Sequence, residues 1–403
     1  MNSALKNHAT YINNKVDTNE ISLSQYISTD NILQNKQGIE CATSLPIQGG
    51  KVTAFKKGDI LLANIRPYLK KIWYAQFDGG CSADVLAIRA NAETDSHFLF
   101  YALFRDDFFI HAMKGAKGTK MPRGDKAQIM EFKIPVFDLK TQQSIASVLS
   151  ALDKKIALNK QINARLEEMA KTLYDYWFVQ FDFPDANGKP YKSSGGDMVF
   201  DETLKREIPK GWKSGNILNM ANLLGGGTPS KSSSEYWNGN IPFFTPTDCD
   251  NSIFILDTAD KITDAGLCNS STRLFKKHSI FITARGSVGR SSITAVPMAM
   301  NQSCYAFQAK ENVSYTFLFF LIRELIMILE VKATGSVFNS IVSSDIETTD
   351  LVIPDEDLIM KFGSFCEPLF NQIETTLKQN HHLTQLRDFL LPMLMNGQVS
   401  VAE

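Results

Sequence analysis

The chain has 403 residues, which is enough for two to four domains with hydrophobic cores, and its 44% hydrophobic content is ordinary for a globular protein. Its 42 Lys and Arg residues nearly balance 43 Asp and Glu residues, and a net charge of -1 is not that of an isolated high-affinity DNA binder. Local basic patches can still bind DNA where other subunits neutralise part of the phosphate charge.

The cysteines and the N-terminus indicate a cytoplasmic protein. The six cysteines form no CxxC pair, so we expect free thiols in a reducing compartment. The first residues lack the apolar segment of a signal peptide. The most apolar stretch, 315–331, contains Arg323 and Glu324 and is short for a bilayer, which favours a buried helix. We therefore predict a cytoplasmic chain that does not enter a membrane.

Residues 1–139 have the pattern of a mixed α/β domain. Residues 97–113 have the length and the i, i+3, i+4 spacing of an apolar helix, and a glycine-rich basic loop follows at 114–126. Short apolar runs predict strands at 60–65, 85–88 and 132–136. In the loop, glycines let the backbone approach phosphates while cations reach acceptors on DNA. Its cations are Lys114, Lys117, Lys120, Arg123 and Lys126.

A long helical pattern follows, from Thr141, the expected N-cap, to about Val179. Its seam residues recur at alternating four- and three-residue steps, which is a heptad pattern with two asparagine layers. Such a helix is on the order of 55 Å long, which is more than a small-domain core needs, so we expect a spacer with a partner helix. The seam is Leu152, Ile156, Asn159, Asn163, Leu166, Ala170, Leu173 and Trp177.

Prolines and glycines then interrupt the pattern, so 181–207 is predicted to be a linker. A second globular domain spans about 208–355, and a second heptad helix begins near Asp357 and ends at about Gly397. Two such helices, separated by a whole domain, would most simply pair antiparallel with each other; the alternative is that each packs on its own domain. Buried asparagine costs stability but fixes register. The second seam is Leu369, Ile373, Thr376, Asn380, Leu383, Arg387, Leu390 and Leu394.

The two halves of the chain repeat each other. Phe98-Leu-Phe-Tyr101 returns as Phe317-Leu-Phe-Phe320, an offset of 317 − 98 = 219 residues, so the unit is the size of a domain. Two similar domains, each followed by a long helix, suit a target with two-fold symmetry, and duplex DNA is the obvious candidate.

Loops in the second half also carry polar and basic residues near glycines. Residues 283–290 form a glycine-rich turn after a predicted strand, and 334–339 lie at the position equivalent to the basic loop of the first half. The alternative for each loop is a solvated surface with no ligand. The second-half candidates for DNA contact are Thr228, Ser230, Lys231, Arg285, Arg290, Thr334 and Asn339.

No catalytic or metal-binding pattern emerges. The P-loop motif requires glycine before its lysine, but Ser230 stands before Lys231. The six histidines form no HExxH pair, and no GxSxG nucleophile elbow occurs. We predict no catalytic residue and no metal site in this chain.

Taken together, the order of domains and helices resembles the specificity subunit of type I restriction–modification systems. Segments that carry the resemblance are Tyr26-Ile-Ser-Thr29, Tyr176-Trp-Phe178, Gly226-Gly-Thr-Pro-Ser230, Ala284-Arg-Gly-Ser-Val-Gly289 and Leu391-Pro-Met-Leu-Met-Asn-Gly397. The resemblance implies a mixed α/β (α+β) fold with two target recognition domains, 1–139 and 208–355. It also implies that the helical regions, 140–180 and 356–403, form an antiparallel coiled coil with a pseudo-two-fold internal repeat.

The resemblance further implies that the chain recognises a split site in double-stranded DNA and docks two methyltransferase subunits. It leaves open whether restriction subunits, which are translocases and nucleases, join the complex. S-adenosylmethionine and ATP with magnesium would belong to those partners, so the chain itself would bind no cofactor and perform no reaction. The first domain has no GGTPS-type opening, so we expect the two domains to be similar only in their second parts.

Two alternatives come from other classes of protein. One is a stand-alone nuclease or methyltransferase with diverged motifs, which the purified chain would reveal with S-adenosylmethionine or metal. The other is a coiled-coil scaffold for proteins without DNA specificity, which the neutral net charge favours.

Overall fold

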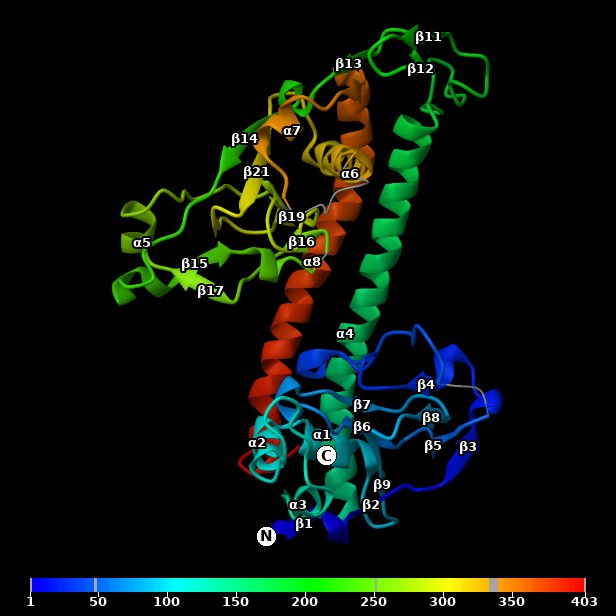
Figure 1. Ribbon diagram of the computed structural model, residues 1–403, viewed down its shortest axis with the longest axis vertical. Helices are drawn as coiled ribbons and strands as arrows, with labels where there is room; N and C mark the ends of the chain where they lie inside the picture. The colour runs from blue at the N-terminus through cyan, green and yellow to red at the C-terminus, as the bar shows by residue number, and fades with distance from the viewer. Residues whose placement is uncertain (1, 47–48, 251, 333–339, 402–403) are drawn as a thin grey trace. The chain divides into compact units, whose positions relative to one another are not determined.

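The computed structural model describes residues 2–46, 49–250, 252–332 and 340–401. The chain forms two compact units, which we call the first unit (Met1–Ile156 with His382–Glu403) and the second unit (Ala157–His381). The long helices α4 (Leu139–Tyr174) and α8 (Glu356–Met395) contribute to both units (Figure 1). None of the helices described is both long and apolar enough to cross a membrane.

Strands of the first unit form two four-stranded sheets, in the orders β2–β9–β6–β7 and β3–β5–β8–β4, and a small β1–β10 sheet. All four residues of β6 are buried, as expected for an apolar run without alternation. The strands are β1 (Asn2–Ala4), β2 (Ala9–Tyr11), β3 (Lys15–Asp17), β4 (Tyr26–Ile27), β5 (Lys51–Phe55), β6 (Ile60–Ala63), β7 (Ile72–Tyr74), β8 (Gly79–Cys81), β9 (Val85–Ala90) and β10 (Lys133–Pro135).

The helix expected at 97–113 is in fact two helices, α1 (Ser96–Phe104) and α2 (Asp106–Lys114), and a short α3 (Lys126–Met130) follows. The break lies at Arg105, whose ψ of 148° is extended. Carboxylates are favourable in the first turn of a helix, and Asp106 and Asp107 occupy that turn of α2. The prediction of one continuous helix was therefore wrong. The apolar spacing continues across the break, and the two carboxylates that mark the start of a second helix were not taken into account.

Strands of the second unit repeat this plan in the order β14–β21–β18–β19–β16, with smaller β17–β15–β20, β13–β22 and β11–β12 sheets. The strands are β11 (Met198–Asp201), β12 (Arg206–Pro209), β13 (Lys213–Gly215), β14 (Ala221–Gly225), β15 (Trp237–Phe244), β16 (Phe254–Ile255), β17 (Asp260–Ile262), β18 (Ile280–Thr283), β19 (Ser291–Thr294), β20 (Ala299–Met300), β21 (Cys304–Ala309) and β22 (Leu351–Ile353). The helices are α5 (Asp264–Cys268), α6 (Tyr315–Lys332) and α7 (Ser343–Glu347).

Similarity between the two globular domains begins near their N-termini, at β1 and β13, so its restriction to their second parts was wrong. In the first unit β1 pairs with β10 and β2 with β9; in the second, β13 pairs with β22 and β14 with β21. The register also agrees, because Ala9 faces Ala90 as Ala221 faces Ala309. Three-residue strands held by backbone hydrogen bonds need no particular side chains, so the repeat left no motif at this position.

The ends of α4 also differ from expectation. Its N-cap is Asp138, not Thr141, since the helix begins at Leu139 and Asp138 Oδ1 accepts a hydrogen bond from Thr141 N at 2.7 Å. At its other end α4 passes into a π turn at Asp175–Val179. The predicted linker, 181–207, contains β11 and the first residues of its partner strand β12. Within it, Phe183 stacks on Tyr191 and Trp212 with ring centroids 4.6 and 5.1 Å apart.

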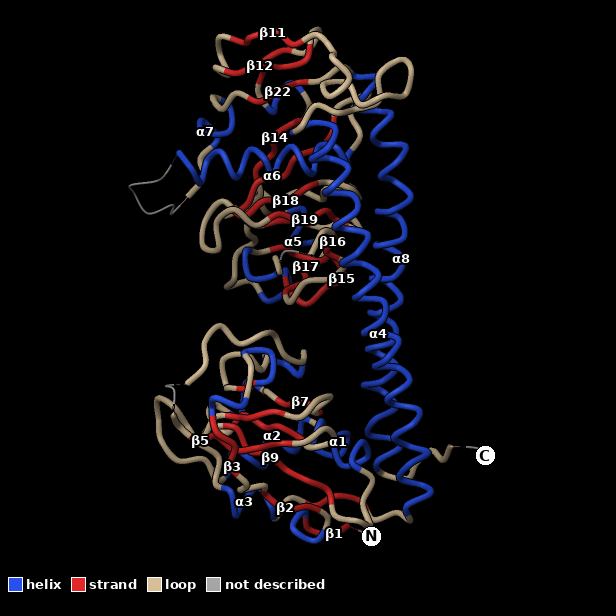
Figure 2. The backbone as a smooth tube through the Cα atoms, turned by 90° about the vertical axis from the view of Figure 1, so that its right-hand side faces the viewer, coloured by secondary structure: helices blue, strands red, loops and turns tan. Residues whose placement is uncertain are grey.

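Helices α4 and α8 lie side by side, as Figure 2 shows. In the second unit, Asn159 Nδ2 donates to Asn380 Oδ1 at 2.9 Å, and Asn163 accepts a hydrogen bond from Thr376. Partner numbers on α8 fall as those on α4 rise, so the pair is antiparallel. In the first unit the layer is charged: Arg387 Nη1 lies 2.8 Å from Asp153 Oδ1.

The seam residues differ in how deeply they are buried. Six predicted seam residues are buried: Asn159, Ala170, Trp177, Ile373, Thr376 and Leu394. The other predicted seam positions are half-buried: Leu152, Ile156, Asn163, Leu166, Leu173, Leu369, Asn380, Leu383, Arg387 and Leu390. The helices also contribute to the cores, because Leu149 and Leu391 belong to a cluster of the first unit and Ala170 and Phe370 to one of the second. Pairing and packing on the domains therefore occur together.

Candidate nucleic-acid interface

Two equivalent strand-and-turn arrangements carry most of the predicted DNA-contact residues. In the first unit, Gly124 N donates to Asn64 O at 3.0 Å, which attaches the basic loop to the end of β6. In the second, Ile341 N donates to Ala284 O at 2.9 Å at the equivalent end of β18. Thr334 and Asn339 lie outside the described residues.

The basic loop of the first unit, 114–126, is closed like a hairpin. Lys117 and Arg123 exchange two backbone hydrogen bonds of 2.9 Å, and Arg66 N donates to Pro122 O at 2.7 Å. The loop is thus held against the turn that follows β6, and its backbone polar groups are used to fix its shape.

All five predicted cations of this loop are exposed, namely Lys114, Lys117, Lys120, Arg123 and Lys126. Two of them face carboxylates: Arg123 lies 3.0 Å from Asp84, and Lys117 lies 3.9 Å from Asp125. Asp125 is the N-cap of α3, and its bonds from Gln128 N and Ala127 N lower the pKa of its carboxyl. With five cations and two carboxylates, the loop keeps a positive excess that suits a phosphate backbone.

The turn of the second unit presents one arginine and anchors the other. Arg285 is exposed, and its backbone N donates to Ser303 O at 3.1 Å. Arg290 Nη1 donates to Cys249 O at 2.9 Å, so part of that guanidinium is already engaged. Gly286 has a φ of +86°, which is a left-handed conformation that glycine adopts without strain. Arg285 is therefore the better placed of the two arginines to reach a ligand.

The glycines of the GGTPS segment have a packing role. A Cβ atom on Gly226 would collide with the carbonyl oxygen of Asn301, and one on Gly227 would collide with the Ser271 side chain. The segment can therefore lie between these two stretches only with glycine at both positions. The next residue, Thr228, donates its hydroxyl to Gln302 Oε1, next to the Ser303 carbonyl that binds Arg285.

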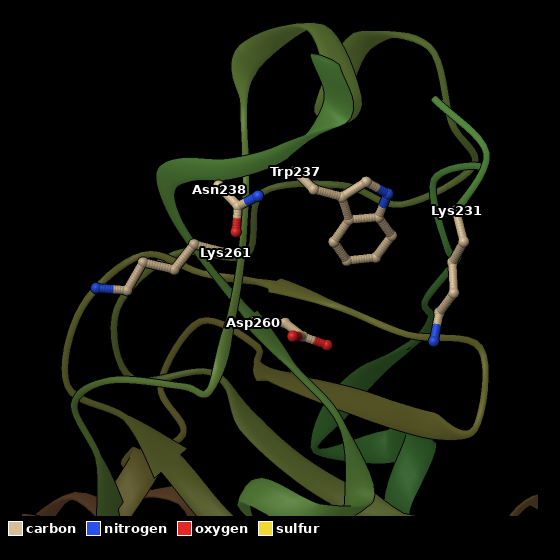
Figure 3. Close-up of a pocket in the computed structure, with 5 residues that line it drawn as sticks. All are labelled: Lys231, Trp237, Asn238, Asp260 and Lys261. Carbon is tan, nitrogen blue, oxygen red and sulfur yellow. The ribbon is translucent and has the colours of Figure 1, made fainter. Parts of the chain in front are cut away.

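Lys231 lines a separate small pocket of about 250 Å³ together with Trp237 (Figure 3). Trp237 Nε1 donates to Ser230 O at 3.0 Å, and the Ser230 and Ser232 hydroxyls lie 2.7 Å apart. The pocket is lined by Lys231, Trp237, Asn238, Asp260 and Lys261. The structure thus connects Thr228 with Arg285 through 302–303 and groups Ser230 with Lys231, while Arg290 is turned to Cys249.

Comparison with known proteins agrees with this two-fold plan. The profile of a family described as "Type I restriction modification DNA specificity domain" matches residues 4–168 and again 209–385. The chain belongs to this family. It is a type I restriction–modification specificity subunit, the DNA-recognition subunit of its complex.

Known specificity subunits resemble most or nearly all of the chain. The specificity subunit of the type I restriction enzyme HindI from Haemophilus influenzae is 26% identical over 96% of this chain and 97% of its own. The MjaIX specificity subunit from Methanocaldococcus jannaschii is 28% identical over 76% and 70%. A crystal structure of the type I S subunit from M. genitalium shares the fold, with a TM-score of 0.60, 15% identity and coverage of 98% and 96%.

The specificity subunit has further exposed or cationic residues at this interface that sequence reasoning missed. They lie in the turn after β6: Arg66, Tyr68, Lys70 and Lys71. The offset of the repeat was the signal that could have found them, since it maps this turn onto 284–290. Among the residues described, no group of three or more His, Cys, Asp or Glu side chains could hold a metal ion.

Proposed function

We propose that each unit reads one half of a split DNA sequence, with 1–139 and 208–355 as the target recognition domains. The observation that supports this is the pair of equivalent strand ends, which have the same backbone hydrogen bonds but different side chains. In the first unit Arg123 forms an antiparallel β-bridge with Ile65. At the equivalent place in the second unit, Ser340 forms one with Arg285. One scaffold with two sets of side chains suits two half-sites of different sequence.

Within each half-site, arginine is the natural base reader and lysine the natural phosphate ligand. An exposed arginine can donate two hydrogen bonds to guanine O6 and N7 in the major groove. Arg123 and Arg285 are exposed in the two arrangements, and Lys114, Lys117, Lys120 and Lys126 are exposed in the same loop as Arg123. Each base contact is worth about 1–3 kcal/mol against the wrong base.

The helical regions, 140–180 and 356–403, act in this proposal as a spacer between the half-sites and as a docking surface for two methyltransferase subunits. Large apolar side chains remain at least half exposed on both helices, which is typical of a protein-binding surface: Leu158, Met169, Phe365 and Phe389. S-adenosylmethionine would bind to those adenine methyltransferase subunits, and ATP with magnesium to restriction subunits where present. The cytoplasm is where we expect this complex to work.

A genome-wide map of N6-methyladenine, with and without the gene, tests recognition directly. We expect a split motif that disappears on deletion, and Arg285→Ala should relax one half of that motif while the other half stays unchanged. Lys276→Ala, which removes an exposed cation before β18, is the matched control and should leave the motif intact. A contiguous motif, or relaxation of both halves by Arg285→Ala, would contradict the proposal.

The spacer role has its own test. The antiparallel register sets residues 157–163 opposite 376–382, so deleting both segments removes two turns from each helix in step. The helices shorten by about 10 Å, and the gap between half-sites should shrink by about 3 base pairs. An unchanged gap in a correctly assembled complex would refute the spacer role.

Docking is tested by Phe389→Ser, which removes an exposed aromatic side chain from α8. We expect this change to weaken methyltransferase binding by about 2 kcal/mol, the cost of losing an aromatic anchor. Phe200→Ser in the β11–β12 hairpin removes a similarly exposed ring and is the control. Equal binding by both variants would contradict docking on α8.

A further inference from the structure

The turn after β6 in the first unit is the structural equivalent of the turn after β18 in the second. Ala63 N donates to Lys71 O at 3.1 Å in the first unit, and Thr283 N donates to Arg290 O at 2.9 Å in the second. The strands on both sides of each turn also pair in the same antiparallel order. The two turns can therefore be compared position by position.

Two positions in each turn have a left-handed backbone, but the residues there differ. The second unit uses Gly286 and Gly289, both with a φ of +86°. The first unit has Arg66 with a φ of +50° and Lys70 with a φ of +51°. A long side chain is unfavourable in this conformation, whereas glycine is not. Strained residues of this kind concentrate at functional sites.

Arg66 also has an unsatisfied side chain. It is half-buried, its Nε is shielded from solvent, and within the described part of the chain its guanidinium has no hydrogen-bond or ion-pair partner. Beside it, Asn64 is 9% exposed and its Oδ1 is likewise buried without a partner. A buried donor and a buried acceptor without partners are unfavourable, so the free chain leaves this position incomplete.

The cations near Arg66 already have partners. Asp106 lies 2.7 Å from Lys36 and 3.0 Å from Lys70, and Lys71 donates to Thr29 O at 2.5 Å. Asp84 is engaged by Arg123 at 3.0 Å. Asp106 and Asp84 are therefore already paired with other cations, so Arg66 is available to an anion supplied by a ligand.

We propose that Arg66 binds a backbone phosphate of the DNA half-site that the first unit recognises. This inference rests on the proposed function, because it needs DNA beside the basic loop. Arg66 N is bonded to Pro122 O within that loop, so DNA held by the loop passes over the turn. A guanidinium matches phosphate oxygens in charge and geometry, and a rigid, recessed turn suits a contact that sets position rather than one that probes base edges.

The test exploits the repeat, because Arg66→Gly installs the residue that the second unit has at the same left-handed position. The variant should fold as well as the wild-type chain, since it removes strain and an unpaired cation. Reconstituted with the methyltransferase subunits, it should bind target and unrelated duplexes about tenfold more weakly or worse. The slope of log affinity against log salt should fall by about 0.9, which corresponds to one lost phosphate contact.

Lys205→Gly is the matched control. Lys205 is also a left-handed cation, with a φ of +53°, but it belongs to the β11–β12 hairpin and pairs with Glu202 at 3.1 Å. Its replacement should leave both affinity and salt slope unchanged. Wild-type affinity and slope in Arg66→Gly would overturn the inference, as would a loss of sequence preference at an unchanged slope, which marks a base contact.

Failure of the proposed function would look different from failure of this inference. If the wild-type complex showed no preference for any split duplex, the half-site proposal itself would fall. If the wild-type complex bound its split site and Arg66→Gly bound it equally well, only the phosphate role of Arg66 would fall.

Discussion

The two units share one backbone plan but attach to α4 and α8 through different chemistry. In the first unit the inter-helix layer is an ion pair, Asp153 with Arg387, and Tyr101 donates its hydroxyl to Asp153 at 2.7 Å. In the second unit the layers are neutral, with Asn159 facing Asn380. The comparison shows that the backbone register carries the repeat, while the side chains that stabilise it can change from charged to neutral.

The two domains also differ at an equivalent place in their apolar helical segment, which is continuous in α6 and broken between α1 and α2. In α6 the polar pair Arg323 and Glu324 stays within one helix, because the Arg323 guanidinium lies 4.4 Å from the Phe319 ring and Glu324 accepts a hydrogen bond from Tyr174 at 3.0 Å. At the equivalent place in the first unit, Arg105 is extended and α2 begins. Contacts of the polar side chains, within the helix for Arg323 and with α4 for Glu324, thus allow α6 to continue through polar residues.

Removing a large side chain from the core of one unit should give the greatest loss of stability, and that loss should be confined to the unit that is changed. Phe98 and Phe317 are equivalent, with 1% and 0% exposed, so either substitution by alanine should lower the free energy of unfolding of its own unit by about 3–5 kcal/mol. Hydrogen exchange, read separately for amides of each unit, measures this. Equal loss of protection in both units would show that they unfold together and would break the comparison.

Substitution in the charged layer should lower the free energy of unfolding more than substitution of an exposed residue beside it. Asp153→Ala leaves Arg387, whose side chain is 15% exposed, without its inner partner, and leaves the Tyr101 hydroxyl unpaired. We expect a loss of about 2 kcal/mol, below the usual cost of breaking a buried pair because Arg387 keeps Asp388 at 2.8 Å. Asp388→Ala, which removes this exposed partner, should cost less than about 1 kcal/mol. If thermal denaturation showed similar losses of stability for Asp153→Ala and Asp388→Ala, the burial of the Asp153–Arg387 pair would not determine its contribution.

Replacing the polar side chains of the neutral layer by apolar ones should raise the free energy of unfolding. The double change Asn159→Leu with Asn380→Leu replaces a buried amide pair, in which Asn159 Oδ1 has no partner, by apolar contact. We expect the free energy of unfolding to rise by about 1 kcal/mol, while helix register becomes less specific. Denaturation and disulfide trapping of shifted registers would measure the two effects. A destabilised variant with a single register would contradict the role assigned to the amides.

The smallest expected effect is on the pH dependence of the second unit. Burial, with help from nearby Lys277, lowers the pKa of His278, which stacks on Tyr315 at 4.1 Å. The unfolded chain then binds more protons, so stability should fall as the pH drops through about 6.5, the ordinary histidine value, and level off below the lowered pKa.

Glu374 responds at lower pH. Burial raises the pKa of its carboxyl, but its bonds with Lys277 and Lys378 outweigh this and lower it. Its contribution to stability is complete above the ordinary glutamate pKa and is lost as the pH falls through the lowered one. Between pH 7 and 5, His278→Asn should therefore flatten the decline in the second unit, with the first unit as reference. An unchanged slope in hydrogen exchange would exclude His278 as its source.

Features that depend on side-chain pattern were already evident in the amino-acid sequence. The 219-residue repeat, the heptad seams with their asparagines, the buried strand at 60–63 and the basic loop all follow from periodicity and composition, which report which faces must be buried. The family followed from short motifs whose order, rather than any single one, was specific.

Features that depend on backbone geometry became evident only in the folded chain. The break at Arg105, the cap at Asp138 and the early strands β1 and β2 were hidden because backbone hydrogen bonds accept many side chains. The same reason hid Arg66, since its left-handed backbone and its unpaired guanidinium exist only once the turn is folded against the loop. Pattern reports burial, whereas register and partners are decided by segments that meet from far apart in the chain.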